Sequence, residues 1–227
     1  MSAQVALKSP NTAGEALALR TAWMAEEAGP LRATGTVIDV PEGQEICAEG
    51  EQADSFYKVV SGVVRVCKFL NDGRRQIEAF HVAGDLFGVE LGEERLLSAE
   101  AVTDCKVVVY RRRSVEQLAK SDHAVSHQMF HYAMQSLARA QTHSLLLGRR
   151  GAAEKVASFL LDWAAKATAN GSVHLAMSRQ DIADYLGLTI ETISRSMSQF
   201  ERDGVIALAG PRDLRVLKRA ALETLAN

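Results

Sequence analysis

The chain of 227 residues lacks the features that mark several common classes of protein. It has only three cysteines, Cys47, Cys67 and Cys105, with no CxxC spacing and none near the N-terminus. Because an iron–sulfur cluster needs four thiolates or equivalent ligands, this count excludes such a cluster. We expect the three thiols to be small buried side chains in strands of a cytosolic protein.

Long apolar runs and a signal-peptide pattern are also missing, which predicts a cytoplasmic protein that does not contact a membrane. The sequence shows no Ser/His/Asp set and no glycine-rich phosphate loop, so we do not expect an enzyme. His123, His127 and His131 recur every four residues, but no carboxylate or cysteine completes a metal site at matching spacing. An exposed polar stripe is the preferred interpretation, and no cofactor is expected.

An excess of positive charge is absent from the whole chain, whose net charge is −2. Residues 149–227 nevertheless hold 11 Lys and Arg against 9 Asp and Glu, whereas residues 1–148 hold 15 against 19. If the C-terminal part binds nucleic acid, it must do so through a local basic surface, with a strong dependence on salt.

Residues 178–200, SRQDIADYLGLTIETISRSMSQF, carry the signals of two short helices joined at a glycine. Ser178 with an acidic residue three positions later fits an N-terminal cap, the first helix ends near Gly187, and Thr189 fits the cap of the second. Apolar residues at helical spacing are expected to face inward. They are Ile182, Ala183, Leu186, Ile193, Met197 and Phe200.

The polar face of the second helix carries Glu191, Ser194 and Arg195 in its first turns. In a helix-turn-helix this end of the helix enters the major groove, where arginine binds guanine and a carboxylate accepts from cytosine. The alternative is an ordinary surface pair of Glu191 with Arg195. The next segment, DGVIALAGPRDLRVL, has two apolar runs around a Gly-Pro turn, which predicts a β-hairpin wing and favours DNA reading.

This segment resembles the DNA-binding half of Crp/Fnr-type transcription regulators, most of all the FixK branch, in the string MSRQDIADYLGLTIET. The resemblance extends over about residues 31–220. It implies an activator that binds a palindromic site with TTGAT-type half-sites as a homodimer. It also implies that this activator recruits RNA polymerase at promoters for low-oxygen respiration and, in rhizobia, nitrogen fixation.

The resemblance also implies roles for individual residues. Arg195 is expected on the guanine and Glu191 on the cytosine of the paired strand, with Ser194 beside them. Ile190 stands where the cAMP-receptor branch has a guanine-reading arginine, so that branch's first G·C contact should be missing. The positions implied to contact phosphates are Ser178, Arg179, Gln180, Thr189 and Thr192.

Glycines at regular intervals organise the N-terminal half. Gly50, Gly62, Gly73 and Gly84 separate runs rich in β-branched and aromatic residues, which is typical of a β-roll or jelly roll. Residues 71–73, Asn-Asp-Gly, predict a tight hairpin turn. The stretch GRRQIEAFHVAGDLFG narrows the expectation, by resemblance, to a cyclic-nucleotide-binding-type roll.

The ligand segment of such a roll is altered in this chain. In the cAMP-receptor branch it holds a glutamate for the ribose and an arginine-serine pair for the phosphate, and here it reads DLFGVELGEERLLSAEAV. Arg95 occupies the phosphate position, but Leu96 replaces the serine and Val89 lies near the place of the glutamate. Apolar side chains cannot satisfy a buried phosphate, so we expect cAMP to bind poorly or not at all.

A stretch without proline, from residue 114 to residue 150, predicts one long helix between the two halves. A 3-4-3-4-3 spacing indicates the seam of a two-stranded coiled coil and hence a homodimer. The seam residues are Phe130, Ala133, Leu137, Ala140, Ser144 and Leu147. The alternative is that the helix packs on its own roll, which it must do in part with Tyr132, Met134 or Leu145.

The sequence therefore predicts an α+β protein with an N-terminal arm (1–30), a β-roll (31–112), a dimerisation helix (113–148) and a winged helix-turn-helix domain (149–227). A short amphipathic helix anchored by Leu17 and Trp23 is expected in the arm. Two other hypotheses stay open. In one, the roll holds an unrecognised small ligand. In the other, a ligand-sensing or catalytic protein uses its C-terminal helices to bind a protein partner.

Overall fold

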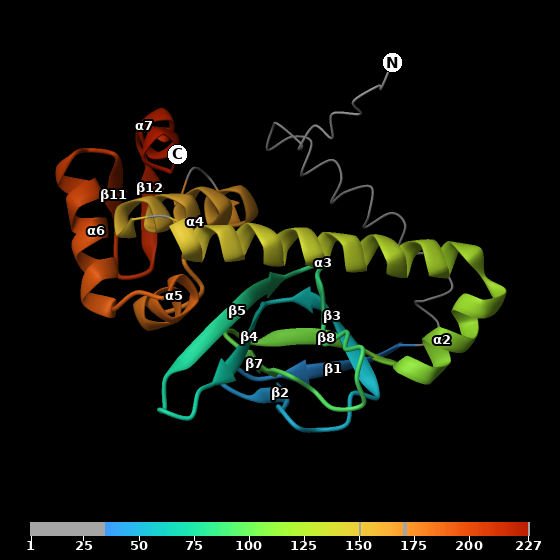
Figure 1. Ribbon diagram of the computed structural model, residues 1–227. Coiled ribbons are helices and arrows are strands. Elements are labelled where there is room, and N and C mark those ends of the chain that lie inside the picture. Colours follow the sequence, from blue (N-terminus) through green and yellow to red (C-terminus); the bar gives the residue numbers. More distant parts are fainter. Residues whose placement is uncertain (1–34, 150, 170–171, 227) are drawn as a thin grey trace, which may run out of the picture.

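The computed structural model describes residues 35–149, 151–169 and 172–226 (Figure 1). The helix expected around Leu17 and Trp23 lies outside these residues. The architecture is α+β, as predicted: a β-roll lies under a long helix, and a helical domain with a small sheet lies at one end of that helix.

The roll consists of two antiparallel four-stranded sheets. One has the order β1-β8-β3-β6 and the other the order β2-β7-β4-β5. The strands are β1 (Gly35–Val40), β2 (Glu45–Cys47), β3 (Ser55–Ser61), β4 (Val63–Phe69), β5 (Arg75–Val82), β6 (Leu86–Phe87), β7 (Ser98–Ala101) and β8 (Cys105–Arg111). Val59, Val64 and Val107 are fully buried between the two sheets because alternate residues of each strand point inward.

The predicted hairpin at residues 71–73 joins β4 to β5, and its Gly73 has a φ of 83°, a value that favours glycine. The three cysteines are buried in β2, β4 and β8, as expected. Burial raises the pKa of each thiol, that of Cys67 to about 11. These thiols are therefore protonated and unreactive at neutral pH.

The prediction of one continuous helix after the roll was wrong, because the structure has α2 (Arg112–Ser121) and α3 (His123–Arg149). Asp122 between them is extended, with a φ of −125° and a ψ of 107°. Its side chain accepts a hydrogen bond from the Ala124 N–H at 2.8 Å. An aspartate that binds the backbone two residues on competes with helix continuation, and here it starts a new helix.

Helix α3 packs one face on the roll and leaves another uncovered. Val125 and Tyr132 are 1% and 6% exposed and lie in a cluster with the stacked rings of Phe56 and Tyr110. Of the three side chains considered for this packing, Tyr132 is buried, whereas Met134 and Leu145 are exposed.

The C-terminal domain contains more elements than the sequence indicated. Its helices are α4 (Ala152–Ala167), α5 (Arg179–Leu186), α6 (Ile190–Arg202) and α7 (Arg219–Leu225). Its strands β9 (Thr168–Ala169), β10 (Ser172–His174), β11 (Ile206–Leu208) and β12 (Asp213–Val216) form a sheet in the order β11-β12-β10-β9. The sequence analysis anticipated α5, α6 and the β11–β12 hairpin, and did not assign the other elements.

A single hydrophobic cluster joins the two domains. It extends from Ile77 and Phe80 of β5 through Phe159 and Trp163 of α4 to Ile193 of α6. The helical domain is thus packed on the roll rather than tethered to it. Among the helices described, none is long and apolar enough to cross a lipid bilayer.

Candidate nucleic-acid interface

The first helix of the predicted helix-turn-helix, α5, begins and ends as its sequence indicated. The Ser178 side chain accepts from the Asp181 N–H at 3.1 Å, and the Asp181 carboxylate accepts from the Ser178 N–H at 2.9 Å, so the two form a capping box. Gly187 ends the helix in the left-handed conformation with a φ of 61°. Ile182, Ala183 and Leu186 are buried, as predicted.

The second helix, α6, starts at the Thr189 cap, whose hydroxyl accepts from the Thr192 N–H at 3.3 Å. Ile193, Met197 and Phe200 are buried and fix the rotation of α6 about its axis. The helix lies along the outer edge of the molecule, at the end farthest from α2 (Figure 1).

This rotation exposes the candidate base-reading residues together. Glu191, Ser194 and Arg195 are exposed, and Ile190 is 38% exposed beside them. Within the described chain no ion pair joins Glu191 to Arg195, although the positive charge of Arg195 contributes to lowering the pKa of Glu191. The Ser194 hydroxyl donates to the Ile190 carbonyl at 2.9 Å. The pKa of Glu191 is lowered by hydrogen bonds from its own backbone and from Thr189, so it is ionised at neutral pH.

The candidate phosphate contacts surround this face but differ in accessibility. Gln180 and Thr189 are exposed, whereas Ser178 and Thr192 are half-buried and already engaged in the caps. Arg179 is half-buried as well. One of its terminal nitrogens is buried with no hydrogen-bond partner, and burial lowers the pKa of the guanidinium. In this conformation part of the Arg179 guanidinium group is directed into the protein interior.

The predicted wing is present as the hairpin of β11 and β12, whose turn is closed by a hydrogen bond from the Ala209 N–H to the Asp213 carbonyl at 2.9 Å. Arg212 and Arg215 on this hairpin are exposed, although Arg212 also donates to the Ala176 carbonyl. These two exposed cations lie on the wing, and no motif in the sequence had marked them as candidates.

A charged network that no sequence motif indicated joins α5 to the roll. We call Arg65, Arg75, Glu100, Asp181 and Asp184 the roll–helix network. Their side chains are between 7% and 18% exposed. Arg65 lies 2.5 Å from Glu100 and 3.2 Å from Asp181. Arg75 binds Asp181 and lies 2.8 Å from Asp184.

Burial alone would raise the pKa of Asp181. Hydrogen bonds from Ser178 and the positive charges of Arg65 and Arg75 outweigh it, and the pKa is lowered. Asp181 therefore has two roles, as the capping partner of Ser178 and as the centre of the roll–helix network. The sequence signalled only the first, because its arginine partners lie 116 and 106 residues away.

The ligand segment of the roll also differs from a phosphate site. Arg95 is 3% exposed and donates to the Ser55 carbonyl at 2.7 Å, the Tyr57 hydroxyl at 3.3 Å and the Gly88 carbonyl at 3.4 Å. Val89 and Leu96 are exposed. Two nitrogens of the Arg95 guanidinium are thus engaged with the protein, whereas its Nε is buried without a hydrogen-bond partner among the described residues. Val89 and Leu96 offer no polar group, so this pair does not fit a cyclic phosphate.

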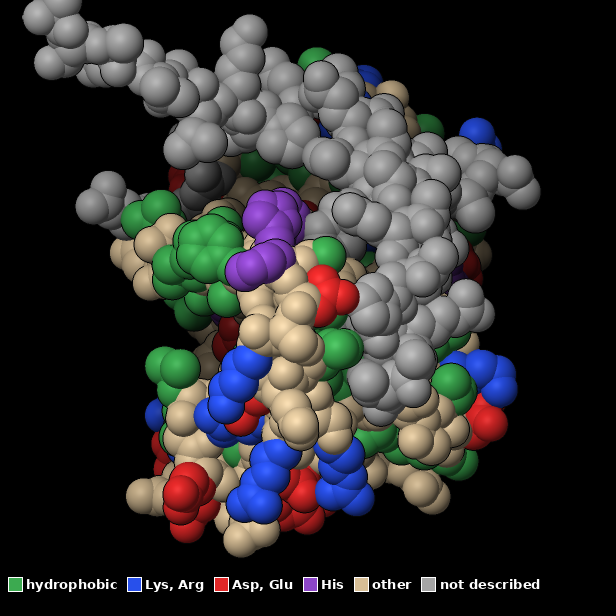
Figure 2. Space-filling view, turned by 90° about the vertical axis from the view of Figure 1, so that its right-hand side faces the viewer, with side chains coloured by type: hydrophobic (Ala, Val, Ile, Leu, Met, Phe, Trp, Pro, Cys, Tyr) green, Lys and Arg blue, Asp and Glu red, His purple; other side chains and the backbone are tan. Residues whose placement is uncertain are grey.

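The histidine stripe lies on α3. Figure 2, which views the α2 end of the molecule, shows histidine side chains together on the surface, and His123 and His127 are exposed. His131 shares a hydrogen bond with the Gln135 side chain.

The β-roll, the long helix and the winged helix-turn-helix with its exposed polar face define a DNA-binding transcription regulator. Sequence profiles agree: that of the cyclic nucleotide-binding domain matches residues 37–122, and that of the Crp-like helix-turn-helix domain matches residues 154–225. The chain belongs to the Crp/Fnr family, and within that family it is similar in sequence to the FixK proteins.

Three comparisons carry this assignment. The nitrogen fixation regulation protein FixK of Azorhizobium caulinodans is 47% identical over 206 residues, which cover 88% of this chain and 83% of that protein. FixK of Rhizobium meliloti is 39% identical, with coverage of 89% and 93%. The structure of FixK2 from Bradyrhizobium japonicum superposes with a TM-score of 0.82 at 42% identity and covers 85% of this chain and 98% of that one.

Proposed function

We propose that this protein is a FixK-type activator that binds a palindromic TTGAT-type site as a homodimer and recruits RNA polymerase to genes for low-oxygen respiration and nitrogen fixation. Arg195 reads the guanine, Glu191 the cytosine of the paired strand, and Ser194 and Ile190 complete the base-reading set. Ser178, Arg179, Gln180, Thr189 and Thr192 contact the phosphates. The curated relatives named FixK are nitrogen fixation regulators, and this supports the choice of genes.

The observation that carries the proposal is the exposure, on the first turns of α6, of a carboxylate and a guanidinium that form no ion pair with each other in the described part of the chain. Two opposite charges one helical turn apart usually pair on a surface. Within the described chain Glu191 and Arg195 form no ion pair with each other, and both side chains are exposed, although Glu191 also accepts hydrogen bonds from its own backbone and from Thr189. A cytosine N4 and the O6 and N7 of guanine are suited to these two groups.

The dimer is supported by the uncovered face of α3. Phe130 and Leu137 in the predicted seam are 64% and 50% exposed, and Ala133, Ala140 and Ser144 are exposed as well. Leu147 is half-buried. A second copy packed on this seam would cover the large apolar side chains and would set two α6 helices about 34 Å apart, the spacing of adjacent major grooves.

We also propose that the protein acts without cyclic AMP and without an iron–sulfur cluster. The engaged guanidinium of Arg95 supports the first statement. The three buried and protonated cysteines support the second. The division into arm (1–30), roll (31–112), dimerisation helix (113–148) and DNA-binding domain (149–227) remains our proposal, with the break at Asp122 inside the third part.

A gel-shift titration tests the proposal. The purified protein is titrated into a duplex with TTGAT and ATCAA half-sites and into a scrambled duplex of equal composition, without any nucleotide. We expect the specific duplex to bind about 10³-fold more tightly, at a salt concentration kept constant. Equal affinity for the two duplexes, or a requirement for cyclic AMP, would contradict the proposal. Sedimentation of the complex then reports whether two chains bind one site.

A further inference from the structure

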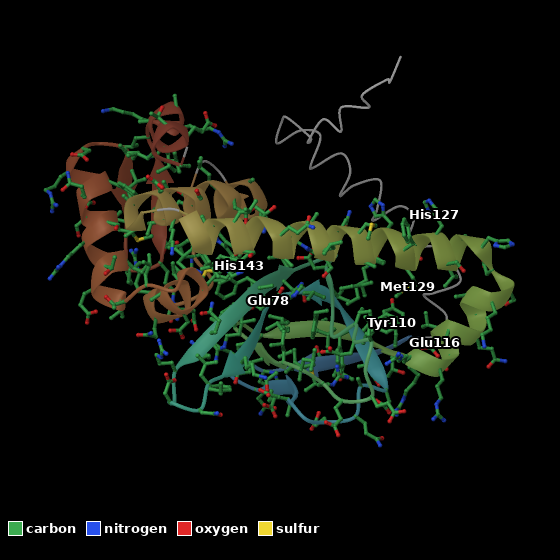
Figure 3. The ribbon with its side chains drawn as sticks, viewed as in Figure 1. Glu78, Tyr110, Glu116, His127, Met129 and His143 are labelled. Atoms are coloured by element: carbon green, nitrogen blue, oxygen red, sulfur yellow. The ribbon has the colours of Figure 1, made fainter. Side chains whose placement is uncertain are left out.

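A large cavity lies where the roll, the long helix and the DNA-binding domain meet. Its volume is 740 Å³, and it is bordered by β5, α3, α4 and α5. Cavities of this size commonly hold small molecules. In Figure 3, Glu78 of β5 and His143 of α3 lie toward one another across the space between strand and helix. An occupant would touch residues of the roll, of the long helix and of α5 itself.

One side of the cavity is an aromatic wall made of Phe80, Phe159, Trp163 and Tyr185. The ring of Phe80 lies 5.4 Å from that of Tyr185 and 6.2 Å from that of Trp163. The Trp163 indole is held by a hydrogen bond to the His174 carbonyl at 2.8 Å. The wall is thus built in advance of any ligand, and its rings mostly cover one another, since Phe80, Phe159 and Trp163 are 8%, 4% and 2% exposed. An aromatic occupant would lie against the edges of this packed cluster.

His143 supplies an acceptor next to this wall. Its ring stacks on Tyr185 with centroids 4.1 Å apart and planes 4° apart, and its Nε2 lies 2.8 Å from the Tyr185 carbonyl. Because a carbonyl can only accept, Nε2 carries the proton and Nδ1 of the neutral ring accepts. Burial lowers the pKa of His143, which keeps the ring neutral at physiological pH.

Among the charged side chains that line the cavity in the described chain, Glu78 alone has no ion-pair partner. The other charged side chains at the cavity are paired, Arg139 with Asp85 at 2.8 Å and Lys166 with Asp162 at 2.7 Å. Within the described chain, the Glu78 carboxylate has no hydrogen bond and no ion pair. Burial raises its pKa, and Arg139 opposes this shift only in part. A half-buried carboxylate without a partner is costly, and a cation in the cavity would relieve that cost.

We propose that this cavity binds a small aromatic ammonium compound. Its ring packs on the aromatic wall, and its ammonium group donates to Glu78 and to Nδ1 of His143. The inference concerns a site separate from α6, so it can be tested without DNA.

Tryptophan fluorescence provides the measurement. The chain has two tryptophans, and replacing Trp23, which lies outside the described residues, by phenylalanine leaves Trp163 in the cavity wall as the only reporter. The probes are phenethylammonium, 2-phenylethanol and phenylacetate, which share one ring and differ in charge. We expect phenethylammonium to saturate with a midpoint on the order of 1 mM and to bind about tenfold more tightly than the alcohol, with phenylacetate weakest.

Two variants in the W23F background locate the site. Glu78→Gln should remove the about tenfold preference for the ammonium while the alcohol still binds. Ala138→Phe should block all three probes by filling the cavity. Glu116→Gln removes a carboxylate of α2 outside the cavity and should change nothing.

Thermal unfolding establishes that each variant is folded. If the Glu78→Gln variant does not fold, the charge preference is decided by titrating the W23F protein with the three probes. No saturation up to about 10 mM phenethylammonium, equal binding of ammonium and alcohol, or binding that survives Ala138→Phe would overturn the proposal.

Discussion

Helices α5 and α6 are adjacent in sequence and each carries an acidic residue in its first turn, yet the two acids have opposite environments. Asp181 of α5 is 5% exposed and binds two arginines of the roll. Glu191 of α6 is exposed and binds no cation within the described chain. The first helix is anchored to the roll, and the second is left free to meet a ligand. One motif therefore combines a structural contact with the surface that we propose reads DNA.

Removal of the Asp181 carboxylate is the strongest way to test this difference. Asp181→Ala leaves Arg65 and Arg75 largely buried with less negative charge nearby and deletes the capping partner of Ser178. Loss of one member of a buried ion pair typically costs about 3 to 5 kcal/mol. We expect a loss of this size in the free energy of unfolding, measured by urea denaturation. Glu191→Ala, the matched change in α6, removes an exposed first-turn acid and should lower the midpoint much less. Equal effects of the two substitutions would contradict a larger contribution from the buried network.

Acid should remove part of the same contribution. The pKa of Asp181 in the folded protein lies below its ordinary value of 3.8, so folding favours the ionised form. The resulting stability is fully present above about pH 5 and is lost as the pH falls below 4 toward the folded pKa. The difference in unfolding free energy between the wild type and Asp181→Asn should therefore shrink between pH 5 and pH 3. A difference that stays constant over this range would mean that the charge of Asp181 is not what stabilises the contact.

The proposed role of α6 in base reading is tested by DNA binding rather than by unfolding. Arg195→Ala should weaken binding to the TTGAT duplex by about 1 to 3 kcal/mol and relax the choice at the guanine position, because the lost contacts are to a base. Arg179→Ala should weaken specific and scrambled duplexes alike, because a phosphate contact carries no base information. Competition gel shifts with all four bases at this position measure both effects. Equal losses on both duplexes for Arg195→Ala would contradict its assigned role.

Features that depend on residues close together in the chain could be predicted from the sequence alone. The caps at Ser178 and Thr189, the turn at Gly187 and the buried stripe of α6 each depend on residues within one or two turns, and each was predicted. The hairpin turn before β5 belongs to the same class, because a tight turn is specified by its own residues.

The sequence did not predict contacts between residues far apart in the chain, nor the position at which one helix ends and the next begins. The partners of Asp181 come from strands more than 100 residues away, so no spacing in the sequence connects them. At Asp122 no proline or glycine marks the break, and the side-chain bond to the Ala124 N–H accompanies the start of a new helix. The cavity between β5 and α3 is likewise a product of domain packing, which periodicity does not report.

The turn between the anchored helix and the free one gives the smallest expected effect. Gly187 has a φ of 61°, and a Cβ placed there would meet nothing closer than a Leu147 methyl carbon at 3.7 Å, which is ordinary contact. The cost of Gly187→Ala is therefore conformational, about 1 kcal/mol of unfolding free energy, and Gly187→Asn should cost less because asparagine tolerates this conformation. Because neither side chain alters the exposed face of α6, both variants should keep the base preference at the guanine position. Urea denaturation and the competition gel shift measure the two quantities separately. A changed base preference in Gly187→Ala would mean that the turn sets the orientation of α6 relative to DNA. In that case the packing of Ile193, Met197 and Phe200 would not be sufficient to set it.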